Sequence, residues 1–318
     1  MIRKYFFHII IFFFTKSLSG QENDFKIITQ DAVNFWKAVD SLKAGSDTTQ
    51  LFQTLVIDKA SEEFKVFISK WHIKASHYSY QVKNYPQFYK TLRQYTIQLL
   101  AAEKKIREIV TRFRVLYRGF KPADICIAFG NFSTGGNIEI TGDRKLVYIG
   151  LEYHGLDTNT FIKELPVSIQ DYVSRSNFFR TIIHELVHIQ HKTHGKKTIQ
   201  ALHGNLLVNR ILSEGIPDFI SQLIVNSGNN GNYYTYGLEH EQHLKQQLSK
   251  DLWTNGNGNW FGGNDSLFKT QPRDLGYFMG AQIARNFYTF NKPKNGDLRN
   301  LIEIKNAEQF IRESKYFE

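Results

Sequence analysis

The chain has 318 residues, of which 42% are hydrophobic and 22% are charged, and its formal net charge is +10 at pH 7. A chain of this length buries a large core on its own, and its single cysteine, Cys126, excludes an intramolecular disulfide. The basic excess is spread along the chain without a nucleic-acid-binding signature. We therefore expect a solvated basic face and no nucleic-acid partner, with attraction to an anionic envelope surface as the alternative.

Residues 1–20 carry the pattern of a cleaved secretory signal peptide. Arg3 and Lys4 form a basic start, residues 5–14 are apolar except for His8, and residues 17–20 include small residues suited to cleavage. The apolar run is too short to cross a bilayer, and no second long apolar run follows. The sequence predicts a bacterial protein that is periplasmic or secreted, with no transmembrane segment in the mature chain. The alternative is an uncleaved anchor or a buried helix.

Residues 21–118 are predicted to be mainly helical. Apolar residues recur at helical spacing over 31–42, 49–71 and 88–117, and residues 99–106 have strong helix propensity. No internal repeat is present. We expect this region to pack as a layer on a catalytic part formed by residues 119–318; the alternative is a separate helical domain.

Three runs rich in β-branched and aromatic residues follow, at 125–129, 137–141 and 145–153. Residues 141–144, Thr-Gly-Asp-Arg, predict a tight hairpin between the last two runs. We expect a small sheet packed against helices. The run 145–153 is the candidate edge strand that holds an extended peptide by strand addition, and the alternative is a sheet that only supports a helix.

The most informative motif is His184-Glu185-Leu186-Val187-His188. Histidines four residues apart lie on one face of a helix and can share one Zn²⁺ ion, while Glu185 is placed to take a proton from a metal-bound water. The composition gives this pattern by chance only about 0.02 times per chain of this length. The surrounding residues are apolar, so the helix is expected to be buried and its polar groups to need a metal or partners.

A catalytic zinc site needs a third protein ligand, and Glu214 is the preferred candidate. It lies in Ser213-Glu214-Gly215-Ile216-Pro217-Asp218, which we interpret as the start of a helix with Ser213 as N-cap and Pro217 in or near the first turn. Glu214 and Asp218 then share one face. Asp218 is expected to accept the other ring N–H of a ligating histidine.

His194 is the rival third ligand, because it has the spacing of the metzincin motif HExxHxxGxxH. That motif requires a glycine where this chain has His191, so the helix is expected to continue to about His194 and to end at Gly195. His194 would then lie about 15 Å along the axis from His184, too far to share a metal. We interpret His191 and His194 as solvated residues at the basic helix end.

HELVH followed by EGIPD resembles the gluzincin zinc metalloproteases, in which HExxH supplies two ligands and the base, and an ExxxD helix supplies the third ligand and an orienting aspartate. With Gly-Tyr-Phe-Met-Gly at 276–280, the chain resembles a family of predicted zinc-dependent proteases of exported bacterial proteins, a domain of unknown function distantly related to a gliding-motility lipoprotein. The resemblance covers about 124–288. It implies an α+β, zincin-like fold with a small sheet on the active-site helices. The family usually has alanine where this chain has Pro217, and this difference affects where the helix that contains Glu214 is expected to begin.

Hydrolysis also needs a donor that stabilises the oxyanion, and Tyr277 is the first candidate. It lies 63 residues after Glu214, between Gly276 and Gly280, two glycines that would let it sit close to another backbone, and a neutral phenol can donate a hydrogen bond. His240 and His243 are held in reserve. The alternative is that Tyr277 only packs in a helix.

Together these features predict a zinc-dependent peptidase, acting as a monomer on a peptide or protein substrate outside the cytoplasm. Zinc lowers the pKa of its water, and Glu185 takes the proton and returns it to the leaving amine. Two other classes stay open: a non-catalytic zincin-fold envelope protein involved in assembly, binding or surface motility, and a lipid- or surface-binding accessory protein. The Asn- and Gly-rich stretches 226–232 and 255–265 are predicted loops, with or without a role as a lid.

Overall fold

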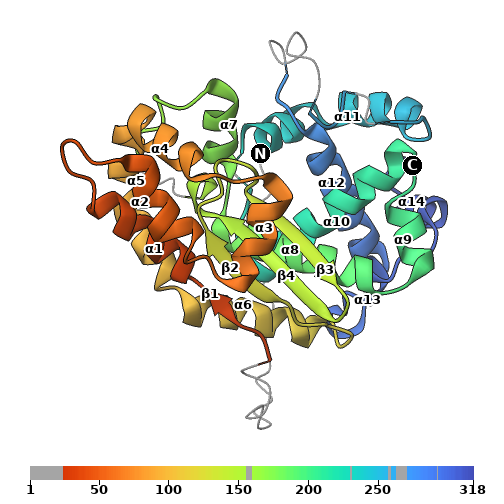
Figure 1. The fold of residues 1–318 in the computed structure, drawn as a ribbon. Helices are drawn as coiled ribbons and strands as arrows, with labels where there is room; N and C mark the ends of the chain where they lie inside the picture. Colours follow the sequence, from red (N-terminus) through yellow and green to blue (C-terminus); the bar gives the residue numbers. More distant parts are fainter. Residues whose placement is uncertain (1–23, 155–159, 230, 257–258, 263–270, 292) are drawn as a thin grey trace.

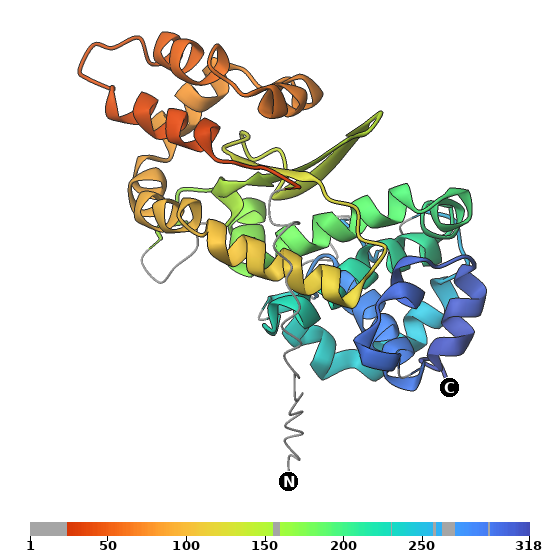
Figure 2. The ribbon, with the colours of Figure 1, turned by 90° about the horizontal axis from the view of Figure 1, so that it is seen from below.

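The computed structural model describes residues 24–154, 160–229, 231–256, 259–262, 271–291 and 293–318. A four-stranded mixed sheet lies between two layers of helices in an α+β arrangement, and the layers are clearest when the sheet is seen from below (Figures 1 and 2). The predicted signal peptide, residues 1–20, lies outside the described residues. The strands, in chain order, are β1 (Ile27–Ile28), β2 (Asp124–Ala128), β3 (Gly136–Thr141) and β4 (Arg144–Gly150).

The strand order in the sheet is β1-β2-β4-β3. β2 pairs in parallel with both β1 and β4, whereas β3 and β4 form an antiparallel hairpin. The hairpin was predicted, and Thr141 pairs with Arg144 across a turn in which Gly142 has φ +59°. Ile125 to Ala128 are fully buried, as expected for a strand that is covered on both faces and flanked by two others.

The prediction of an edge strand at 145–153 was wrong. β4 has neighbours on both sides, and β3 forms the edge of the sheet. The regular strand also ends at Gly150, after which a 3₁₀ turn, η2, covers Leu151–Tyr153. The reason is the parallel pairing of β4 with β2, a long-range contact that local patterning does not reveal.

The N-terminal region is helical, as predicted, but its helices are shorter than the apolar periodicity suggests. The 49–71 segment breaks before Ser61, which caps the next helix and whose hydroxyl and N–H both donate to the buried carboxylate of Asp31, at 2.6 and 2.8 Å. The 88–117 segment breaks at Ala101 and Ala102. The helices are α1 (Gln30–Asp40), α2 (Thr48–Phe52), the π-helical η1 (Gln53–Ile57), α3 (Glu62–Trp71), α4 (Ala75–Asn84), α5 (Pro86–Leu100) and α6 (Glu103–Leu116).

The N-terminal region and the rest of the chain share one hydrophobic core. Strand β1 from the N-terminal region belongs to the sheet, and α1 and α3 pack on β2. On the opposite face of the sheet, α8 packs on β3 and β4 (Figure 2). The remaining helices are α7 (Val167–Arg175), α8 (Phe178–Thr193), α9 (Lys196–Leu202), α10 (Leu207–Val225), α11 (Asn232–Asp251), α12 (Leu275–Asn291), α13 (Arg299–Ile302) and α14 (Ala307–Ser314), with a short turn η4 (Lys294–Gly296).

Helices α10 and α12 touch backbone to backbone. A Cβ added at Gly215 would lie 2.1 Å from the carbonyl carbon of Gly280, and one added at Gly280 would lie 2.1 Å from the carbonyl oxygen of Ile211. Both glycines are therefore required by this close approach rather than by the conformation of a turn.

The predicted start of the Glu214 helix was also wrong. α10 begins at Leu207, so Ser213 is a buried residue inside the helix and Pro217 lies in its middle. Proline there removes one helical hydrogen bond. The helix continues because residues on both sides of Pro217 are buried, so tertiary packing outweighs the local penalty.

Asn226 ends α10 in the left-handed region, and residues 227–229 lie outside any helix or strand, as predicted for the loop at 226–232; residue 230 lies outside the described residues, and Asn232 already begins α11. Part of the predicted loop at 255–265 lies outside the described residues. Among the helices in the described part of the chain, none combines the length and the apolar character needed to cross a membrane.

Candidate metal centre

Helix α8 presents two different faces. Its apolar side chains, among them Ile182, Ile183 and Val187, are fully buried in the core. Asn177 caps its first turn, since its side-chain oxygen accepts from the backbone N–H of Arg180 at 3.0 Å. One face of the helix therefore anchors it, and the other carries the polar residues of the motif to a cavity.

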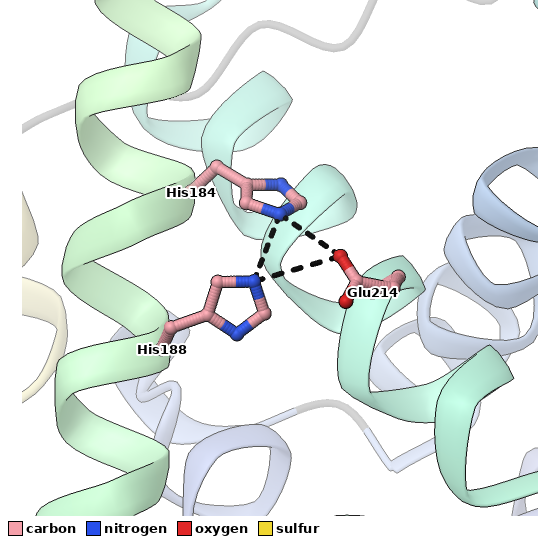
Figure 3. Close-up of side chains that lie close together, drawn as sticks. All are labelled: His184, His188 and Glu214. Carbon is pink, nitrogen blue, oxygen red and sulfur yellow. Dashed lines mark hydrogen bonds and ion pairs between the residues drawn. The ribbon is translucent and has the colours of Figure 1, made fainter. Parts of the chain in front are cut away.

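The structure brings His184, His188 and Glu214 together from α8 and α10 (Figure 3). The two histidine Nε2 atoms are 3.0 Å apart, and the Glu214 Oε2 atom lies 3.3 Å from His184 Nε2 and 3.5 Å from His188 Nε2. In a tetrahedral zinc site with ligands at ~2.0–2.1 Å, neighbouring ligand atoms are about 3.3–3.4 Å apart. The spacing and the donor types of these three residues therefore fit a metal ion.

Electrostatics within this cluster favour an ionised Glu214. Burial raises the pKa of its carboxyl, but the adjacent His188 and His184 outweigh burial and hold the pKa well below its ordinary value. Burial lowers the pKa of His184, and the hydrogen bond to Glu214 together with nearby carboxylates reverses this into a net rise. A carboxylate between two imidazoles is the charge pattern of a cation site.

Glu185 lies on the same cavity but outside the ligand cluster. Its side chain is 8% exposed, and burial raises its pKa while His188 and His184 oppose the rise. A Cβ added at Gly136 would lie only 2.6 Å from Glu185 Oε1. The carboxylate is therefore held against the first residue of β3, where a raised pKa suits a proton acceptor and donor.

Asp218 lies one turn beyond Glu214 on α10, as predicted, but its contacts are with other groups. Its Oδ1 pairs with Arg180 Nη2 at 3.1 Å, and its Oδ2 accepts from the Gln222 amide at 3.1 Å. This buried ion pair ties α8 to α10 beside the cluster. A hydrogen bond from a ligating histidine to Asp218 stays a prediction.

Tyr277 lies beside the cluster on α12. Its ring centroid is 6.0 Å from that of His184, and burial, followed by the charge of Glu214, raises its pKa well above the ordinary value. A neutral phenol next to the ligands is what the predicted role requires. The reserve candidates His240 and His243 are exposed on α11 and do not line this cavity.

His194 is separated from the cluster and pairs with Glu303, with Nε2 and Oε2 3.3 Å apart. Helix α8 ends at Thr193, close to the predicted end. The interpretation of His191 as solvated was wrong: it is fully buried, its ring centroid is 6.3 Å from that of His188, and neither ring nitrogen has a hydrogen-bond partner among the described residues. The buried part of α8 extends two residues past Ile189, its last apolar residue.

The cavity around the cluster has a volume of about 480 Å³. Sequence reasoning missed several of the residues that line it. Arg180 is one helical turn before His184 and had a usable signal, the same helix face. Other lining residues lie outside the two ligand helices and had no local signal, among them Lys70, Thr134, Tyr172, Arg175 and His203.

Comparison of the chain with protein-family models, with curated proteins and with solved structures finds no match. The functional interpretation therefore depends on the site itself: three potential metal ligands, a buried carboxylate and a phenol around one cavity.

Proposed function

We propose that the protein is a zinc-dependent peptidase that hydrolyses peptide bonds outside the cytoplasm. The observation that carries the proposal is the placement of Glu185 beside the same cavity as the three potential ligands, His184, His188 and Glu214. A site with a purely structural metal has no use for such a base, whereas metal-assisted hydrolysis needs one.

A zinc ion bound by these ligands would polarise a carbonyl group and activate a water molecule. Glu185 takes a proton at its carboxylate and later donates it to the leaving amine. Its raised pKa supports both roles, since the carboxylate has to be protonated and deprotonated in each turnover. Tyr277 donates its phenolic hydrogen to the oxygen that gains negative charge.

The edge strand β3 supports a peptide as the substrate. Gly150 N–H donates to the Gly135 carbonyl, so alternate residues of β3 pair with β4, and the backbone groups of Gly136, Ile138 and Ile140 face away from it. Gly136 and Ile138 also line the cavity. The Gly136 and Ile138 carbonyls already accept from Thr134 Oγ1 and Lys70 Nζ, at 2.5 and 3.2 Å, so an extended peptide that adds to this edge along the cavity would share or replace these two bonds.

The decisive experiment measures zinc content and hydrolysis of fluorescein-labelled casein for the mature chain and matched variants. Glu185→Gln should keep one zinc per chain and lose hydrolysis, whereas Glu214→Ala should lose the zinc. His243→Ala, an exposed histidine on α11, is the control and should change neither property. Full hydrolysis by Glu185→Gln would refute the proposed mechanism, and absence of hydrolysis by the wild type with zinc bound would favour a non-catalytic envelope protein.

A further inference from the structure

Three consecutive residues after β4 hold the segment that leads into β3. Glu152 Oε1 accepts from the backbone N–H groups of Gly130 and Phe132, at 2.9 and 2.7 Å. The hydroxyl of Tyr153 donates to the carbonyl of Phe132 at 2.6 Å. The Nε2 atom of His154 lies 2.8 Å from the carbonyl oxygen of Gly135. We call residues 152–154 the clamp.

The segment held by the clamp has an unfavourable backbone conformation. Asn131 and Phe132 have φ of +62° and +52°, in the left-handed region that L-residues avoid, and this is costly for a bulky residue such as phenylalanine. The N–H groups on either side of Asn131 converge on one buried oxygen of Glu152. The conformation is therefore maintained by the clamp and not by local preference.

His154 joins the two sides of the cavity. Its Nε2 reaches Gly135, just before β3, and its Nδ1 lies 2.9 Å from the hydroxyl of Ser176, just before α8. A carbonyl oxygen only accepts, so Nε2 carries the hydrogen and Nδ1 accepts from Ser176. Burial lowers the pKa of His154 to about 4, which maintains the neutral ring that this arrangement needs.

Small displacements of this strand would reach the catalytic groups. A Cβ at Gly136 would lie 2.6 Å from Glu185 Oε1, and a Cβ at Gly135 would lie 2.9 Å from the ring of Tyr172. Both glycines are in contact with side chains that line the cavity, so there is no free space between the strand and these side chains. A shift of a few tenths of an ångström at Gly135 changes the space available to Glu185.

We infer that His154 is a positioning residue, which fixes the start of β3 against Glu185 by tying Gly135 to Ser176. It deepens the proposed function, because the strand it positions is the one that would bind the peptide. Its hydrogen bonds can nevertheless be tested without hydrolysis, through the protection of backbone amides in β3.

The test is hydrogen–deuterium exchange of the zinc-loaded mature chain, combined with zinc content and casein hydrolysis. His154→Phe keeps a buried ring and removes both hydrogen bonds, so amides of residues 130–141 should exchange about tenfold faster while zinc per chain is unchanged. The value of kcat should fall. His154→Gln, whose amide can donate and accept, should restore most of the protection.

Ser176→Ala removes one hydrogen bond and keeps the inference testable if His154→Phe fails to fold. Its matched control is Ser174→Ala, whose hydroxyl donates only to the Asp171 carbonyl of its own helix, at 2.7 Å. Faster exchange confined to residues 130–141 in Ser176→Ala, but not in Ser174→Ala, supports the role of His154. Unchanged exchange there, or an equal increase over the whole chain, overturns it. A wild type that hydrolyses nothing refutes the proposed function and leaves this exchange result decisive for His154.

Discussion

The two walls of the cavity are held in place in different ways. On one side, the potential ligands lie on long helices, α8 and α10, whose buried faces and helical hydrogen bonds place them. On the other, β3 is an edge strand that pairs with β4 on one side, and the left-handed backbone segment before it is fixed by side chains of the clamp. The helical wall is held by helical hydrogen bonds and buried apolar faces, whereas the strand wall is held by one ladder with β4 and by the side-chain hydrogen bonds of the clamp.

The largest expected effect is a loss of zinc affinity after a substitution in the helical wall. His188→Ala removes one of three protein ligands and should weaken zinc binding by about 1000-fold or more. His194 directly follows the same helix and pairs with Glu303, so His194→Ala should bind zinc as the wild type does. Competition against a chelator of known affinity measures both, and equal losses in the two variants would contradict the assigned ligand set.

The contact between the two ligand helices gives the next largest effect. Arg180→Met leaves the buried carboxylate of Asp218 without its ionic partner and should lower the free energy of unfolding by about 3 kcal/mol. Lys65→Met breaks the exposed pair with Glu62 and should change the free energy of unfolding by less than about 1 kcal/mol. Urea denaturation compares them. Similar losses in the two variants would show that the buried pair does not hold the helices together.

Substitutions in the strand wall should lower kcat without changing the zinc content. Gly136→Ala brings a methyl group against the Glu185 carboxylate and should lower kcat by about 10- to 100-fold, with zinc content unchanged. Gly142→Asn, at the other end of β3 where nothing lies within 4 Å of an added Cβ, is the control and should leave kcat unchanged. Loss of zinc in Gly136→Ala would mean that the two walls are not independent.

The smallest effect on the wild type is the net pH dependence of the clamp, because its two titrations oppose each other. Burial raises the pKa of Glu152 to about 7 from an ordinary 4.5 and lowers that of His154 to about 4 from 6.5. Glu152 thus contributes stability that is present below pH 4.5 and lost as pH rises to 7. His154 contributes stability that is present above pH 6.5 and lost as pH falls to 4. Each slope is at most about 1.4 kcal/mol per pH unit, so between pH 4.5 and 6.5 the two oppose each other.

Variants separate the two titrations. Relative to the wild type, Glu152→Gln should gain stability as pH rises through the range where Glu152 ionises, and His154→Phe should lose stability as pH rises from about 4 to 6.5. Urea denaturation over this range gives the difference profiles. Parallel profiles for all three proteins would show that neither group titrates differently in the folded and unfolded chain.

The same contrast explains what the sequence could predict. The three potential ligands can be found from local patterns: histidines four apart on α8 and a glutamate beside the apolar residues of α10. The hairpin at 141–144 was also local. The start of α10 could not be predicted from local patterns, because Pro217 is tolerated only through packing on both sides of it. The edge position of β3 depends on parallel pairing between β2 and β4, which no local pattern encodes.

Burial of individual polar residues was equally hard to predict. His191 follows the motif among polar and basic residues, yet it is fully buried. Asp31 and Ser61 break a helix through a contact between residues 30 apart. His154 and Ser176 have no motif around them, and their role depends on two chain segments meeting at one ring.

The backbone contact between Gly215 and Gly280 has a consequence for how this site can move. Gly215 directly follows Glu214, and Gly280 lies one helical turn after Tyr277. The contact therefore fixes the spacing between the backbones that carry a potential ligand and the candidate oxyanion donor. Glu214 lies on α10 and Tyr277 on α12, so a sliding motion of α12 along α10 would move the candidate oxyanion donor relative to the potential ligand, and the close contact of the two glycine backbones opposes such a motion.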